Sequence, residues 1–118
     1  DAVSLSEDDN TLVQGVAGSK YGIGYFGFAY FEENADKLKL VPIDGGTGPI
    51  APSNETIKDG TYSPLSRPLF IYVNNQAYER PEVKSLVTFL MENVPTLSAE
   101  VGYIPLPDEK YAEERAKL

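Results

Sequence analysis

Three residue types are missing from this chain of 118 residues, which contains no histidine, no cysteine and no tryptophan. The missing cysteine excludes a thiol nucleophile, a thiolate metal ligand and a disulfide. The missing histidine excludes an imidazole metal ligand and the general base of a serine–histidine triad. Carboxylate chemistry and simple ligand binding are the functions that this composition leaves open.

Positive charge is also scarce, because 10 lysines and arginines face 18 acidic residues and give a formal net charge of −8. This balance disfavours nucleic acid and anionic membrane surfaces, both of which need an excess of basic residues. No apolar run approaches the roughly 20 residues of a membrane-spanning helix. The chain shows no signal peptide, and its opening Asp1-Ala2-Val3 is typical of a processed or truncated end.

Adjacent acidic residues are the only catalytic candidates. Acid–base catalysis needs two carboxyl groups in different environments, one of them in a dry pocket. Each pair here lies in a polar context, so we predict no enzyme and no catalytic residue. The acids near the start lack the alternating oxygen ligands and turn glycine of a calcium loop, so no metal site is predicted. The four pairs are Asp8-Asp9, Glu32-Glu33, Asp108-Glu109 and Glu113-Glu114.

Two glycine-rich stretches resemble nucleotide or phosphate motifs. Gly22, Gly24 and Gly27 match G-x-G-x-x-G. A helical pattern precedes this match and a β-rich run follows it, which reverses the order of a dinucleotide site, so the glycines are interpreted as structural. The Gly/Pro-rich loop over 44–52 lacks the Lys-Ser/Thr ending of a P-loop and precedes no long helix. No cofactor is therefore predicted.

Helical periodicity and capping residues occur in five places. Ser4 and Glu7 have the spacing of a capping box, which predicts a helix from Ser6 or Glu7 to Gly18. On the terminal helix, Glu113 and Lys117 have the spacing of a favourable i, i+4 pair. The other predicted helices are 54–59 with Ser53 as its cap, 81–93, a separate short piece from Pro95 to Gly102, and the terminal helix from Pro107.

Strands are predicted over 22–31, 38–43 and 69–73, because these stretches are rich in aromatic and branched apolar residues. No polar residue interrupts the first, as expected for a central strand covered on both faces. Residues 62–68 are predicted to be extended, and Asn74-Asn75 to form a turn. Helices alternate with strands, so the predicted class is α/β.

Five segments, at residues 6–16, 24–30, 64–74, 80–83 and 101–106, carry a further pattern. Together they resemble the C-terminal portion of PstS-type phosphate-binding proteins of bacterial ABC importers. They occur in the order of that family and cover most of the chain. The resemblance implies an α/β, partial periplasmic-binding-protein (type II) fold, with pieces of two lobes and a hinge crossing.

The resemblance also implies a domain organisation. Residues 1–62 would be the C-terminal part of the second lobe, and residues 63–118 would return through the hinge to the first lobe. The phosphate-holding turns of the family precede this region, so no phosphate-binding residue is expected in this segment. Ser66, Arg67 and Pro68 are expected to be hinge or structural residues.

The implied function is that of a fragment of a substrate-binding protein, periplasmic or at the cell surface of a bacterium. The whole protein would capture inorganic phosphate and deliver it to the membrane subunits of an ABC transporter. The alternative is a stand-alone structural or protein-interaction module derived from half of this fold. Because such a piece would expose core surfaces, domain-swapped or homo-oligomeric association is also expected.

Overall fold

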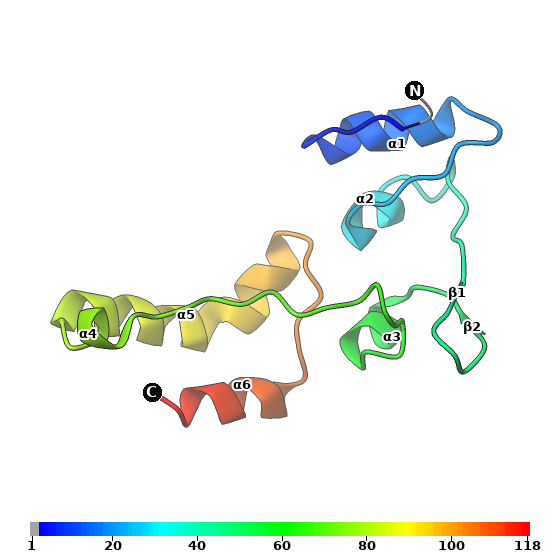
Figure 1. The fold of residues 1–118 in the computed structure, drawn as a ribbon. Helices are drawn as coiled ribbons and strands as arrows, with labels where there is room; N and C mark the ends of the chain where they lie inside the picture. The colour runs from blue at the N-terminus through cyan, green and yellow to red at the C-terminus, as the bar shows by residue number, and fades with distance from the viewer. Residues whose placement is uncertain (1–2) are drawn as a thin grey trace. The chain divides into compact units, whose positions relative to one another are not determined.

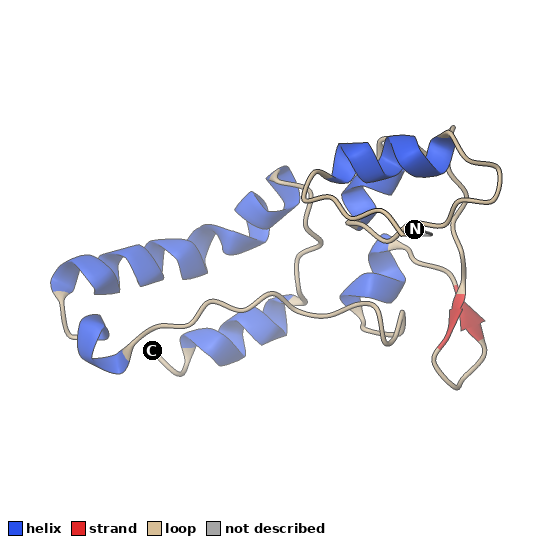
Figure 2. Ribbon diagram, turned by 45° about the horizontal axis from the view of Figure 1, so that its top comes forward, coloured by secondary structure: helices blue, strands red, loops and turns tan. Residues whose placement is uncertain are grey.

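The structure, a computed structural model, describes residues 3–118 (Figure 1). The opening Asp1-Ala2 lies outside the described residues. The chain divides into two compact units, residues 1–42 and 43–118. Helices make up most of the regular structure in the described part, together with one pair of short strands (Figure 2). This mixture of helices and strands confirms the predicted α/β class.

The first unit begins with helix α1, Asp9–Ala17. The side chain of Asp8 caps it by accepting a hydrogen bond from the backbone N–H of Asn10 at 3.0 Å. The predicted start at Ser6 or Glu7 is therefore wrong by two to three residues. An aspartate is a strong N-cap by itself, so the helix begins after it without the capping box suggested by the sequence. Gly18 forms the C-cap, as predicted.

Helix α2, Phe28–Glu32, replaces the end of the predicted strand 22–31. Residues 22–27 lie in neither a helix nor a strand. The Phe28 and Phe31 rings stack with centroids 5.8 Å apart, which suits the i, i+3 spacing of a helix. An uninterrupted apolar run fits a buried strand and a buried helix equally well, so its pattern alone did not decide the outcome.

Gly24, one of the glycines that precede α2, lies close to helix α1. A Cβ atom at this position would lie 2.5 Å from Cγ2 of Val16 on α1. The chain therefore passes so close to α1 that a side chain at this position would clash with it. For Gly24 this agrees with the structural interpretation, because the glycine permits packing of the backbone against a helix.

The second unit starts with strands β1, Ile43–Asp44, and β2, Pro49–Ile50. They pair antiparallel with Ile43 opposite Ile50. The predicted strand 38–43 is wrong over residues 38–42, which have no partner strand among the described residues. A strand forms only where a neighbouring strand accepts and donates its backbone hydrogen bonds. In this hairpin only Ile43 and Asp44 have such a neighbour, which is β2.

Helix α3, Asn54–Lys58, agrees with the prediction to within one residue. Ser53 Oγ accepts the Thr56 backbone N–H at 3.1 Å, and Thr56 Oγ1 accepts the Ser53 N–H at 2.9 Å. This reciprocal pair is a capping box with threonine in the usual place of glutamate. The predicted cap at Ser53 is confirmed.

Helix α4, Asn75–Tyr78, follows the extended segment 67–73. The predicted Asn74-Asn75 turn is the start of this helix, because the Asn74 side chain accepts the Ala77 N–H at 3.1 Å. The predicted strand 69–73 is wrong in the described structure. Its residues are extended, but no hydrogen bond joins the backbone of 67–73 to another described residue.

Helix α5 runs over Pro81–Glu100 without a break, so the two separate helices predicted on either side of Pro95 are wrong. Helix α6, Asp108–Arg115, starts where it was predicted and lies beside α5 in both Figures 1 and 2. Tyr111 of α6 is buried, and its hydroxyl accepts the Leu106 N–H at 3.0 Å. Helix α5 is therefore continuous through Pro95, and α6 contacts it.

Ion pairing on α6 differs from the predicted Glu113–Lys117 pair. Lys110 instead contacts Glu113 at 2.9 Å, and Lys117 contacts Glu114. The helix ends at Arg115, so Lys117 has left the helical path that would bring it over Glu113. Both observed pairs have i, i+3 spacing and are exposed, so solvent screens them and each contributes little to stability.

The described residues bury few side chains. The buried ones are Val13, Pro52, Val87 and Tyr111. The accessible surface of the chain is 9265 Å², whereas a compact monomer of 12.9 kDa exposes about 6300 Å². Large apolar side chains provide much of the excess, including exposed residues on α5 and in the extended segments. The fold therefore has helices and turns in place without a complete core around them.

Candidate functional site

The Gly/Pro-rich loop between β1 and β2 folds around its own carboxylate. Asp44 Oδ1 accepts the backbone N–H groups of Gly46 and Gly48 at 2.8 and 3.0 Å. Both glycines have φ near +100°, at 109° and 101°, which favours residues without a Cβ. A phosphate cradle needs such amides directed at the ligand. Here they hold an internal negative charge, which would also repel an incoming oxyanion.

The same loop packs against the segment that holds the predicted hinge residues. A Cβ atom at Gly45 would lie 2.5 Å from the carbonyl oxygen of Ser63. The Ser63–Pro64 peptide bond is cis. The position of Gly45 lies so close to the Ser63 backbone that only a glycine fits there.

A hydrogen-bonded turn precedes the predicted hinge residues. The Asp59 carboxylate accepts both the hydroxyl and the N–H of Thr61, at 2.6 and 2.8 Å. These bonds, the hydroxyl bond first, lower the pKa of Asp59 below its ordinary value of 3.8. Further along, the Ser66 N–H donates to the Tyr62 carbonyl at 2.8 Å. The backbone is thus held from Asp59 to Ser66.

Ser66, Arg67 and Pro68 lie at the end of this turn. Ser66 is half-buried, and Arg67 and Pro68 are exposed. The Arg67 side chain makes no hydrogen bond or ion pair with another residue of the described range 3–118. The structure therefore brings these three residues together as neighbours in the chain.

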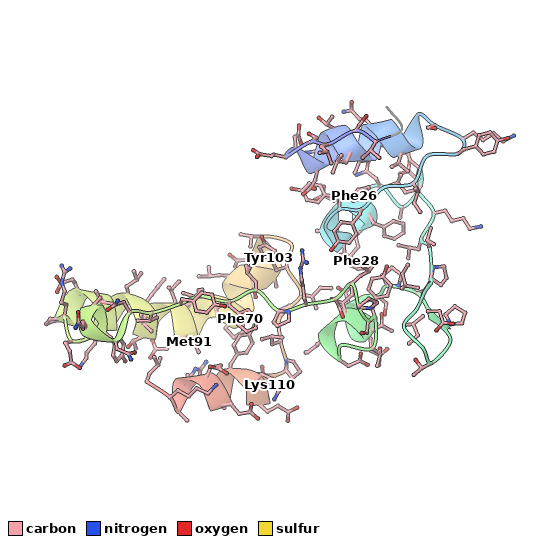
Figure 3. All side chains as sticks on the ribbon, viewed as in Figure 1. Phe26, Phe28, Phe70, Met91, Tyr103 and Lys110 are labelled. Atoms are coloured by element: carbon pink, nitrogen blue, oxygen red, sulfur yellow. The ribbon has the colours of Figure 1, made fainter. Side chains whose placement is uncertain are left out.

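An exposed apolar segment follows at once, Leu69 to Val73. Leu69, Phe70, Ile71 and Tyr72 are 77%, 65%, 65% and 90% exposed. The Phe70 and Tyr72 rings lie 6.3 Å apart on the same side of the extended chain, and Figure 3 labels Phe70. An extended segment with apolar side chains and unpaired backbone groups has the properties of a sheet strand that lacks its neighbour.

Three lysines line a groove in the first unit, and the sequence pattern had not indicated this cluster of positive charge. The volume of the groove is about 590 Å³, and its lining includes Lys20, Lys37 and Lys39 but no acidic residue. Lys37 Nζ donates to Asn34 Oδ1 at 3.3 Å. The three lysines are exposed. Hydrated surface ammonium groups attract anions without fixing their orientation, so the groove lacks the buried polar groups of a specific site.

The adjacent carboxylates are not brought into a shared pocket. Asp8 caps α1, while Glu113 and Glu114 form surface ion pairs. Within residues 3–118, no group of three or more acidic, histidine or cysteine residues is arranged to hold a metal ion. None of the described helices combines the length and apolar character needed to cross a membrane. In the described residues, these acidic side chains serve as a helix cap and as partners in surface ion pairs.

Comparison with known proteins gives consistent matches along the chain. A sequence model of the PBP superfamily domain matches residues 1–94. The protein SphX of Synechocystis sp. is 50% identical over 107 residues, covering 90% of this chain and 32% of SphX. The phosphate-binding protein PstS of Staphylococcus haemolyticus is 40% identical over 113 residues, covering 94% of this chain and 35% of PstS.

A solved structure supports the same relationship. The crystal structure of a possible phosphate binding protein from Planctomyces limnophilus matches with a TM-score of 0.79 and 46% identity, covering 94% of this chain and 40% of that chain. The chain thus spans about a third of the length of the curated relatives named above, at 32% and 35%. The structural likeness confirms the predicted partial fold. Since the family match extends over most of the sequence, this chain belongs to the PBP superfamily.

Proposed function

We propose that this chain is part of a substrate-binding protein that captures inorganic phosphate and delivers it to the membrane subunits of an ABC transporter. The supporting observation is similarity over at least nine-tenths of the chain to PstS, SphX and a possible phosphate-binding protein of known structure. PstS is named as a phosphate-binding protein and the solved structure as a possible one, and a binding role rather than an enzymatic one is proposed here. Such a protein would work in the periplasm or at the cell surface.

The phosphate ligands of the whole protein are proposed to come from outside this segment. Two observations support this placement. The amides of Gly46 and Gly48 are occupied by the Asp44 carboxylate, and no hydrogen bond or ion pair joins the exposed Arg67 side chain to another residue of the range 3–118. A phosphate site relies on several converging amides, hydroxyls or guanidinium groups.

The segment is further proposed to contain the crossing between the two lobes. Residues 1–62 would belong to the second lobe and residues 63–118 to the first, with Ser66, Arg67 and Pro68 at the hinge. Support comes from a hydrogen-bonded turn that ends at Ser66 and an extended chain that begins directly after it. A hinge between two lobes commonly lies where a held turn gives way to an extended chain. The few residues at that point absorb the backbone rotation when the lobes move.

Calorimetric titration with inorganic phosphate tests the proposal. The 118-residue chain is expected to show no heat of binding, whereas the whole product of its reading frame is expected to bind at micromolar concentration or tighter. Micromolar binding by the 118-residue chain alone would contradict the placement of the ligands. Absence of phosphate binding by the whole product would contradict the proposed ligand.

The alternative, a stand-alone interaction module, draws support from the exposed apolar segment at Leu69 to Val73. Contiguous exposed apolar surface on a soluble chain marks an interaction site or a missing part of the fold. Light scattering with a thermal melt separates the two. A monomer with a sharp cooperative transition supports the module, and a swapped dimer or an aggregate supports the fragment.

A further inference from the structure

Helix α5 carries a proline in its interior, and this leaves one of its carbonyl groups without the usual partner. Pro95 has no backbone N–H, so it cannot donate to the carbonyl of the residue four positions earlier. That residue is Met91. An unsatisfied carbonyl in a packed helix is costly, and such groups normally find another donor.

The missing donor is supplied by α6. Arg115 Nε and Nη2 both donate to the Met91 carbonyl oxygen, at 3.1 and 2.8 Å. The two residues are 24 positions apart in the sequence. Figure 3 labels Met91 on α5 and Lys110 on the neighbouring α6. Arg115 takes part in none of the ion pairs found in the described residues, so its guanidinium is directed to this carbonyl.

We propose that Arg115 replaces the amide that Pro95 lacks and thereby latches α6 onto α5. The contact lies beside a small depression lined by Thr88, Met91, Glu92, Arg115 and Leu118. Arginine suits the task because its fixed fork of N–H donors can reach one oxygen with two groups. The latch is a conformational device in which the proline of one helix creates the docking point for another.

The latch governs whether α6 exists as a helix at all. An isolated helix shorter than about 12–15 residues is marginal in water, and α6 has 8 residues. It therefore depends on contacts outside its own backbone, which include the Arg115 hydrogen bonds to α5 and the bond that the Tyr111 hydroxyl accepts from the Leu106 N–H. Release of the arginine is expected to show as opening of α6, while α5 remains helical through its own backbone bonds.

Hydrogen exchange of the α6 backbone amides, measured in the 118-residue chain by mass spectrometry, tests the latch with a double-mutant cycle. Arg115→Ala is expected to raise the exchange of α6 about three- to tenfold. Pro95→Ala restores an amide for the Met91 carbonyl, so Arg115→Ala in that background is expected to change exchange less than about twofold. An equal increase in both backgrounds, or no increase in the native background, would overturn the proposal.

Two controls accompany the cycle. Lys117→Ala removes a neighbouring exposed base that pairs with Glu114, and it is expected to have the same small effect in both backgrounds. In the unmutated chain, NMR is expected to show slow solvent exchange of the Arg115 Nε–H and a coupling across the hydrogen bond to the Met91 carbonyl carbon. Rapid exchange of that N–H without the coupling would overturn the latch independently of any variant.

Discussion

The helical pair α5–α6 and the extended segment 67–73 belong to the same unit but differ in how their backbones are satisfied. In α5 the N–H and C=O groups bond within the helix, and even the carbonyl facing Pro95 receives donors from Arg115. In 67–73 no backbone group bonds to another described residue. A helix closes its hydrogen bonds locally, whereas a strand needs a neighbour. A partial α/β fold therefore keeps its helices and leaves its strands extended.

Proline substitutions are expected to give the largest contrast between these two regions. Val87→Pro in α5 removes a helical hydrogen bond at a buried position and should destabilise the helix by about 3 kcal/mol or more. Ile71→Pro in the unpaired segment removes no hydrogen bond and should change stability by less than about 0.5 kcal/mol. Circular dichroism during urea unfolding measures both.

The Ile71→Pro result also bears on the proposed whole protein. If residues 69–73 join a sheet there, the same substitution should be strongly destabilising in the whole reading-frame product, because proline cannot donate to a ladder. An equally small effect in the 118-residue chain and in the whole product would show that this segment stays unpaired in both. Segment 67–73 would then not be a strand that lacks its neighbour.

A medium effect is expected from the cap of α3. Ser53→Ala removes both the acceptor for the Thr56 N–H and the hydroxyl contact with Thr56, and it should cost about 1 kcal/mol. Ser53→Asp, which keeps an acceptor at the N-cap, is the matched control and should retain the helix. Amide exchange of Ile57 reports the change, and an unaffected rate in the alanine variant would show that the cap is not needed.

The smallest effect is expected from acidification of the turn at Asp59. The folded pKa of Asp59 lies below its ordinary value of 3.8 because the carboxylate accepts the Thr61 hydroxyl and N–H. A depressed pKa stabilises the turn above the unfolded pKa, and this stabilisation is lost as pH falls below about 3.8 through the folded pKa. The Thr61 amide shift, followed by NMR, should move in that window, and Asp59→Asn should abolish the movement.

Short-range features were predictable from the sequence. The cap at Ser53, the start of α5 at Pro81 and the stop of α1 at Gly18 follow from groups within a few residues of one another. Their energetics do not depend on distant parts of the chain, so local rules sufficed. The start of α1 was missed because Ser4, Ser6 and Asp8 all offered acceptor side chains.

Long-range features were not predictable in the same way. The run 22–31 became a loop and a helix because it has no described strand beside it and packs against α1 through Gly24. The contact of Arg115 with Met91 had only Pro95 as a sequence signal, and that proline was interpreted as a break. At the candidate hinge, the sequence identified Ser66, Arg67 and Pro68, but the approach of Gly45 to Ser63 required coordinates.

Residue identity alone established the chemical inventory, the cap of α3 at Ser53 and the family resemblance that the comparisons confirm. Those depend on residue identity and on spacings of a few positions. The folded structure was needed to show which apolar runs pair as strands, which amides are already occupied, and how α6 is held. Each of these outcomes depends on whether a partner group from a distant part of the chain reaches hydrogen-bonding or packing distance.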